Sequence, residues 1–79
     1  MSVQLNELEL IFREVLENED ISINPQTVAA DIVEWDSINH IYLIVAIEKQ
    51  YKIKFTTYEI QSWTNVGDML NNINKLKNK

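Results

Sequence analysis

The group in this sequence best placed to do chemistry is the hydroxyl of Ser37, which lies between Asp36 and Ile38. A helical pattern starts directly after it and runs to about Gln50. The first turn of a helix offers unpaired backbone N–H groups and the positive end of the helix dipole, and both favour a phosphate ester. Ser37 is therefore the first candidate for a functional site.

A purely structural role for Ser37 is the main alternative. A serine before a helix is usually an N-cap, and replacing such a cap by alanine lowers stability by about 1 kcal/mol. No Glu or Gln follows three residues after Ser37 or Asp36 to complete a capping box, which weakens this explanation slightly. The corresponding function would be a small helical adaptor with Ser37 as an N-cap or as a phosphorylation site among acidic residues.

Catalysis by the chain itself is disfavoured by what it lacks. It has one histidine, His40, no cysteine, and a single glycine, Gly67, so there is no glycine-rich phosphate loop. We therefore expect neither an enzyme nor a metal site, and any thioester chemistry needs a thiol from another molecule.

Length and charge narrow the class of protein further. The 79 residues predict one domain over 1–79, and the net charge of −5 is uneven, with nine of the twelve acidic side chains within residues 1–37. An acidic first half argues against nucleic-acid binding and favours a partner with a basic surface, although it could simply keep the protein soluble. With no signal-peptide pattern and no apolar run that could span a membrane, we expect a cytoplasmic protein.

Apolar spacing predicts an all-α fold, a four-helix bundle with a long loop between the first and second helices and a short third helix. The caps expected from the sequence are Ser2 for the first helix, Thr56 or Thr57 for the third, and Asn65, supported by Asp68, for the last. The expected helices cover residues 3 to about 17, 38–50, 58–62, and 65 onwards.

The connection over residues 18–36 is long, but it is not composed like a disordered linker. Pro25 restricts the turn at Asn24, and several apolar residues can pack the segment onto the bundle. These are Ile21, Ile23, Val28, Ile32 and Trp35. We expect the packed loop to hold Ser37 at a fixed place on the surface.

The second predicted helix has apolar residues on both sides. One side, with Ile41, Ile44, Ile47 and Tyr51 and with Leu43 at its margin, is expected to face the core. The other side contains Ile38, Tyr42 and Val45, next to Lys49. These three could be scattered surface residues, or they could form a docking stripe beside Ser37.

The segment from Asp31 to Tyr51, with Asp36-Ser37-Ile38 followed by an apolar helix and Glu48, resembles the prosthetic-group segment of acyl carrier proteins. The resemblance extends over nearly the whole chain. It includes the later order Ile53-Lys54-Phe55, then Glu59-Ile60, then Asn65-Val66 at the start of the last helix.

The resemblance implies that a phosphopantetheinyl transferase attaches 4′-phosphopantetheine from coenzyme A to Ser37, beside Asp36. The chain would then hold acyl intermediates as thioesters and present them to partner enzymes of a biosynthetic pathway, of the fatty-acid or polyketide type. The implied partners are that transferase, an acyl-loading ligase or transferase, and downstream acyl-using enzymes; a monomer is expected. An aminoacyl or peptidyl carrier is the alternative within the same chemistry.

The chain departs from the family pattern around the second helix. Trp35, after Glu34, replaces a frequent glycine. The positions where the family commonly has acidic docking residues retain only Glu48, because the others are Asn39, Tyr42, Lys49 and Gln50. Docking is therefore expected to involve Ile38, Tyr42 and Val45 together with Glu48, and we expect a specialised pathway.

His40 and Trp63 are candidates for the lining of an acyl pocket. His40 falls about one turn into the second helix on its inward side, and Trp63 lies between the third and last helices. Both have a simpler explanation, because a lone histidine or a tryptophan in such a place usually fills the core.

Overall fold

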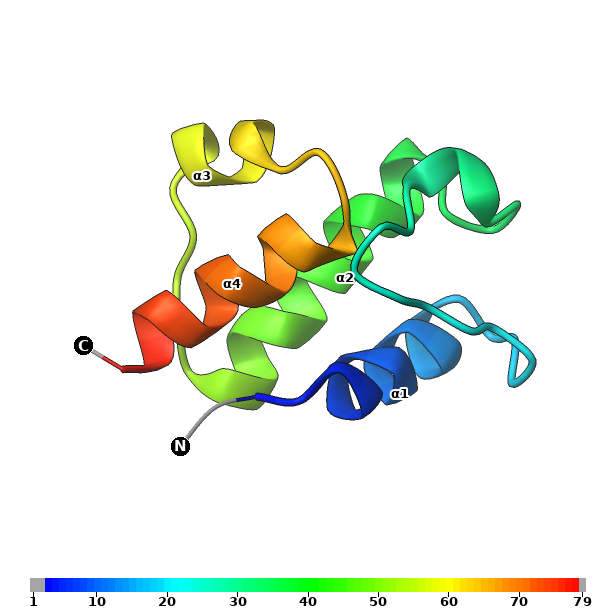
Figure 1. Ribbon diagram of the computed structural model, residues 1–79, viewed down its shortest axis with the longest axis horizontal. Coiled ribbons are helices and arrows are strands. Elements are labelled where there is room, and N and C mark those ends of the chain that lie inside the picture. Colours follow the sequence, from blue (N-terminus) through cyan, green and yellow to red (C-terminus); the bar gives the residue numbers. More distant parts are fainter. Residues whose placement is uncertain (1–2, 79) are drawn as a thin grey trace.

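The computed structural model describes residues 3–78, and within them the chain forms α-helices and one short 3-10 turn, with no strand (Figure 1). The elements are α1 (Leu5–Val15), η1 (Ala29–Asp31), α2 (Ser37–Tyr51), α3 (Thr57–Ser62) and α4 (Val66–Lys77). The predicted all-α fold with a long first connection and a short third helix is confirmed. None of the helices in residues 3–78 is long and apolar enough to cross a bilayer.

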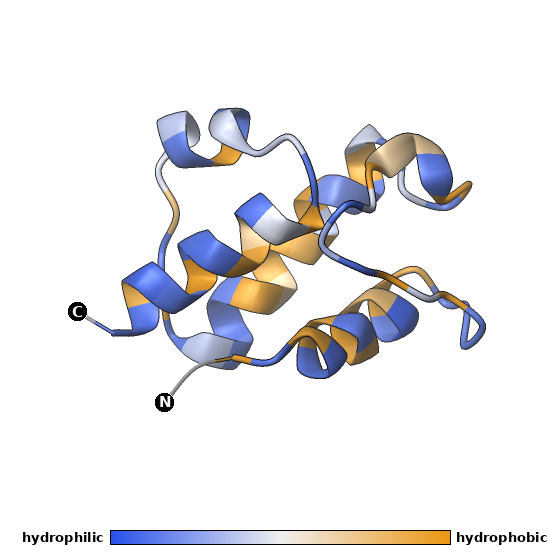
Figure 2. Cartoon of the chain, in the orientation of Figure 1, coloured by the Kyte–Doolittle hydropathy of each residue, from blue (hydrophilic) through white to orange (hydrophobic). Residues whose placement is uncertain are grey.

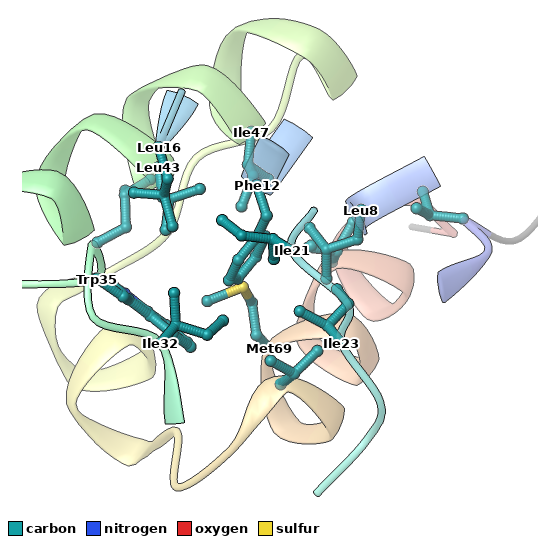
Figure 3. Packing of buried hydrophobic residues seen from close by; sticks show 14 of the residues in the cluster. Leu8, Phe12, Leu16, Ile21, Ile23, Ile32, Trp35, Leu43, Ile47 and Met69 are labelled. Carbon is teal, nitrogen blue, oxygen red and sulfur yellow. The ribbon is translucent and has the colours of Figure 1, made fainter. Parts of the chain in front are cut away.

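One continuous core lies between α1, the long connection, α2 and α4. Figure 3 shows Phe12 of α1 and Met69 of α4 meeting near its centre, with Ile32 and Trp35 of the connection beside them. The ring of Phe12 meets that of Trp35 edge-on, with the ring centroids 4.9 Å apart. The connection therefore contributes to the core as a helix would.

The first helix is shorter than predicted at both ends. It begins at Leu5 with Gln4 as N-cap, whose N–H donates to Glu7 Oε2 (2.6 Å), while the expected cap, Ser2, lies outside the described residues. Val3 is not helical, because its N–H and C=O are both bonded to the side chain of Asn74 in α4. At the other end Glu17 has a φ of 53°, which no right-handed helix accommodates.

The caps of the last two helices agree with the sequence. The N–H of Glu59 donates to Thr56 Oγ1 (3.1 Å), and the N–H of Thr56 donates to Glu59 Oε1 (2.9 Å), a reciprocal capping box. Asn65 caps α4 by accepting from the N–H of Asp68 (2.9 Å). Thr57 is the first residue of α3 rather than its cap.

The long connection is attached to α1 through its backbone. Ile21, Ile23, Ile32 and Trp35 are buried as predicted, and Val28 is half-buried. The C=O of Ile21 accepts from Arg13 Nε (2.7 Å) and the N–H of Ile23 donates to Glu9 Oε2 (2.9 Å). Arg13 and Glu9 also form an ion pair with each other (3.0 Å), so one pair of side chains on α1 holds two points of the connection.

The same connection also contacts the start of α4. Two N–H groups of the first turn of α4, those of Val66 and Gly67, donate to the C=O groups of Thr27 (2.9 Å) and Pro25 (2.8 Å). A Cβ atom on Gly67 would lie 2.9 Å from the oxygen of Pro25. Gly67 is therefore required by the close approach of the two backbones, which links the long connection to the last helix.

The buried face of α2 differs from the prediction. Leu43, Ile44 and Ile47 are buried, while Ile41, expected in the core, is 59% exposed. At about 100° per residue Ile41 lies roughly 110° from the middle of the buried face. Figure 2 shows why the spacing of apolar residues did not identify the buried side of α2. Much of α2 is hydrophobic, whereas apolar and polar residues alternate along α1.

Candidate functional site

Ser37 is the first residue of α2, and its side chain is exposed. The N-cap is Asp36, whose Oδ1 accepts from the N–H of Asn39 (2.8 Å). Capping therefore does not account for Ser37, and the structural alternative in which Ser37 is the N-cap is wrong. Its hydroxyl is left accessible to another molecule.

The backbone around Ser37 is arranged to face an anion. No hydrogen bond among residues 3–78 uses the N–H of Ser37 or Ile38, which belong to the unpaired first turn of α2. The entry into this turn is fixed by Asn39, whose Nδ2 donates to the C=O of Glu34 (2.7 Å). An exposed nucleophilic hydroxyl beside these N–H groups fits the covalent attachment of a phosphate ester.

A pocket of about 530 Å³ opens next to Ser37. Its walls come from the long connection, α2, α3, the α3–α4 connection and α4. Both acyl-pocket candidates from the sequence line this pocket, together with other aromatic and apolar residues. The lining includes Trp35, Ser37, His40, Ile60, Trp63 and Met69.

His40 is held in one orientation by Trp35. The indole Nε1–H of Trp35 donates to His40 Nδ1 (3.0 Å), so the neutral imidazole has its proton on Nε2. Burial lowers the pKa of His40 below its usual value, which favours this neutral form. His40 therefore contributes a fixed neutral ring to the pocket.

Trp63, the other acyl-pocket candidate, is held by side chains of α3 and α4. Its Nε1–H donates to Asn72 Oδ1 (2.9 Å), and Asn72 Nδ2 in turn donates to Glu59 Oε2 (2.8 Å). The indole meets the ring of Phe55 edge-on, with the centroids 4.8 Å apart. Asn72 could not be identified from the sequence, because its partners lie outside α4, Glu59 in α3 and Trp63 directly after α3.

The predicted docking residues lie on the exposed side of α2. Ile38, Tyr42 and Val45 are 64%, 58% and 41% exposed, and Ile41, expected in the core from its spacing, extends the same surface. We call Ile38, Ile41, Tyr42 and Val45 the apolar stripe. Glu48 has a structural task, because its Oε2 accepts from the N–H of Phe55 (2.9 Å) and so fixes the chain after α2.

Comparison with known proteins identifies the class to which this site belongs. Residues 6–73 match the family model described as phosphopantetheine attachment site. The structure is similar to the solution NMR structure of the holo acyl carrier protein from Geobacter metallireducens, with a TM-score of 0.87 and 43% sequence identity over 91% of this chain and 83% of that chain. The comparison with curated proteins gave no match.

The chain belongs to the phosphopantetheine-binding family, and within it to the acyl carrier proteins. It is a carrier and not an enzyme, and its prosthetic group is covalent 4′-phosphopantetheine. When bound, that group supplies a thiol on a flexible arm, on which acyl groups are held as thioesters. Membership of the family also implies interaction with a phosphopantetheinyl transferase and with acyl-using enzymes.

Proposed function

We propose that Ser37 is the residue to which the phosphopantetheine is attached, and that the chain carries acyl groups in a specialised biosynthetic pathway. The observation that supports this most strongly is the position of the Ser37 hydroxyl. It is exposed, it is not used for capping, and it lies beside unpaired N–H groups and the mouth of a pocket.

Asp36 has two roles in this proposal. One carboxylate oxygen caps α2 through the N–H of Asn39. The other oxygen accepts no hydrogen bond within the described part of the chain, and it can help the metal and basic groups of the transferase to orient the hydroxyl of Ser37. The hydrogen bond to Asn39 thus stabilises the start of α2 and also holds the carboxylate of Asp36 next to the hydroxyl of Ser37.

The proposal for Ser37 is tested by loading acyl groups. The wild-type protein, incubated with acetyl-coenzyme A, magnesium and a broad-specificity phosphopantetheinyl transferase, should gain an acyl group that hydroxylamine releases. Ser37→Ala should gain none and keep its helical circular dichroism. Ser22→Ala is the matched control, because Ser22 is an exposed serine of the long connection, and this variant should load normally. Loading of Ser37→Ala would overturn the assignment.

The apolar stripe is proposed as the surface that partner enzymes contact. Its four side chains begin one residue after Ser37, and a partner that reaches Ser37 must pass close to them. Large exposed apolar side chains grouped on one helix face are typical of protein contacts. Glu48 lies beyond the stripe on the same helix and contributes the acidic charge of the contact, with one oxygen already engaged by Phe55.

Tyr42→Ser tests this docking surface with the transferase as the partner. Because Tyr42 is exposed, stability should change by less than about 0.5 kcal/mol. Loss of a contact of about 1 kcal/mol should lower the transferase kcat/KM roughly fivefold. Tyr58→Ser is the control, since Tyr58 is 77% exposed on α3. Equal rates for the two variants would remove the stripe from the contact.

The cellular location and the oligomeric state of the carrier are also proposed. We propose a cytoplasmic monomer that interacts with an acyl-loading ligase or transferase and does not bind nucleic acid. Light scattering on the purified protein tests the assembly state, and a dimer would contradict it.

A further inference from the structure

The side chain of His40 lies next to Ser37 and has one ring nitrogen without a hydrogen bond to any of residues 3–78. We propose that Trp35 fixes the tautomer of His40, and that the Nε2–H of His40 then donates to a carbonyl oxygen of the group carried on Ser37. The inference rests on attachment at Ser37 and adds to it a contact that positions the carried group.

The tautomer of His40 is set by its contact with Trp35. The Nε1–H of Trp35 donates to His40 Nδ1 (3.0 Å), so Nδ1 is the nitrogen without a proton and Nε2 carries it. An indole N–H can only donate, so the direction of this bond cannot reverse. Trp35 is buried and packs edge-on against Phe12, which keeps the indole in place. His40 therefore offers other molecules a proton at Nε2 and no free lone pair.

The proton on Nε2 is open to another molecule. Within the described part of the chain no buried side-chain nitrogen or oxygen lacks a hydrogen-bond partner, and His40 Nε2 has no partner there. Nε2 must therefore belong to the accessible part of this half-buried ring. The same ring lines the pocket beside Ser37. An oxygen seated in that pocket can thus replace water on this N–H.

The position of His40 on α2 brings its ring close to the group that Ser37 carries. The two residues are three positions apart, so their side chains are neighbours on the helix surface, with Cβ atoms about 5 to 6 Å apart. Side chains on a helix lean toward its N-terminus, so the imidazole extends from its own Cα toward Ser37. Because both residues line one pocket, a group esterified to Ser37 that enters the pocket passes His40.

Most other side-chain donors around the pocket are already used. The indole N–H groups of Trp35 and Trp63 are engaged in hydrogen bonds, and the hydroxyl of Thr64 donates to a carboxylate of α4 (2.6 Å). Besides the hydroxyl that becomes esterified, Asn65 Nδ2 and His40 Nε2 remain among the described side chains of the pocket. Asn65 caps α4, whereas His40 is on the helix that bears the attachment site.

The carried group supplies acceptors of the right kind. The phosphopantetheine arm contains amide carbonyl groups, and an acyl group adds the carbonyl of its thioester. Burial lowers the pKa of His40 below its usual value, so the ring is neutral at pH 8 and Nε2–H is a neutral donor. A neutral N–H and a carbonyl oxygen form an ordinary hydrogen bond, and no charge has to be buried for it.

Proton exchange at His40 Nε2 tests this contact directly by NMR. Apo, phosphopantetheinylated and acetyl-loaded proteins with isotope-labelled histidine are compared at pH 8, and His40, the only histidine, gives the only signal. All three forms should carry the proton on Nε2. Its exchange with water should be about fivefold to tenfold slower in the acetyl-loaded form than in the apo form, the factor that a hydrogen bond of ordinary net strength gives.

The phosphopantetheinylated form identifies the acceptor. It has the arm but no thioester, so slow exchange in this form would assign the bond to an amide carbonyl of the arm. Slow exchange in the acetyl-loaded form alone would assign it to the thioester carbonyl. Either result supports a carbonyl oxygen on His40.

Trp35→Phe tests whether Trp35 sets the tautomer. This variant keeps a ring in the core but has no N–H, so His40 should populate both tautomers and lose the slow exchange after modification. Trp63→Phe is the matched control, because it removes the other indole N–H of the pocket, which is bonded to Asn72, and it should keep the proton on Nε2. An unchanged tautomer in a folded Trp35→Phe protein would overturn the role of Trp35.

Wild type alone decides the main point, so no variant has to fold. Equal exchange rates in the apo and both modified forms, or a proton on Nδ1 in the apo protein, would overturn the inference. So would a shift of the Asn65 side-chain amide signal with an unchanged His40 signal, since the donor would then be Asn65. Failure of the attachment proposal looks different, because the mass of the protein would then show no phosphopantetheine on Ser37.

Discussion

Gly67 shows at the scale of one residue how the backbone restricts the sequence. In an exposed helix, replacing glycine by alanine usually stabilises by up to about 1 kcal/mol. Here the added Cβ would lie 2.9 Å from the C=O oxygen of Pro25, to which Gly67 itself donates. The close contact with backbone, which cannot simply rotate away, should outweigh the gain in helix propensity.

We therefore predict that Gly67→Ala lowers the free energy of unfolding by about 1 to 2 kcal/mol. Urea denaturation of both proteins measures the difference. Asn71→Ala, at an exposed position of the same helix, is the control and should be neutral or slightly stabilising. A Gly67→Ala protein more stable than wild type would show that the two backbones do not need this contact.

His40 gives the protein a pH dependence with a definite sign. Burial lowers its pKa in the folded state, and protonation of Nδ1 would also remove the acceptor for Trp35. In the unfolded chain the imidazole titrates near its ordinary value of about 6.5. The contribution of neutral His40 to stability is therefore complete above that pH and is lost as the pH falls from there through the lower folded pKa.

His40→Gln isolates this contribution. Its free energy of unfolding should vary less than that of wild type between pH 8 and pH 5, because the carboxylates titrate in both proteins and only the histidine is absent from one. Denaturation at a series of pH values measures both curves. Parallel curves would mean that His40 titrates alike in the folded and unfolded states.

At the scale of an element, the start of α2 combines a cap with a functional group. Asp36 accepts from the N–H of Asn39, and asparagine can accept the same bond without the charge. Asp36→Ala should lower stability by about 1 kcal/mol, while Asp36→Asn should change it by only a few tenths. Both variants should be modified more slowly by the transferase, because both lack the carboxylate.

Thermal unfolding and transferase kinetics on these two variants separate the roles. Normal modification of Asp36→Asn would leave Asp36 with capping alone. Equal loss of stability in the two variants would mean that the charge, rather than the hydrogen bond, stabilises the start of α2.

At the scale of the whole molecule, local signals in the sequence predicted local structure well. The caps at Thr56 and Asn65 and the buried anchors Ile32 and Trp35 follow from residue type and spacing, and the structure confirms them. The all-α order of elements follows from the same patterns. These features depend on residues that lie a few positions apart in the chain.

What the sequence could not predict depends on contacts between distant segments. Val3 leaves the helix because Asn74 bonds its backbone, and Gly67 is required by Pro25. Ile41 was misplaced because α2 is apolar around most of its circumference, so its periodicity does not identify the side that faces the core. The orientation of Trp63 likewise depends on Asn72, which only the folded chain brings near it.

These segments meet at Ser37, where the long connection ends, α2 begins and the pocket opens. The most direct test of the account is the intact mass of the protein after incubation with coenzyme A, magnesium and a phosphopantetheinyl transferase. Wild type should gain one phosphopantetheine group, and Ser37→Ala should gain none. An unmodified wild type, under conditions that modify another acyl carrier protein completely, or a modified Ser37→Ala protein, would contradict the account.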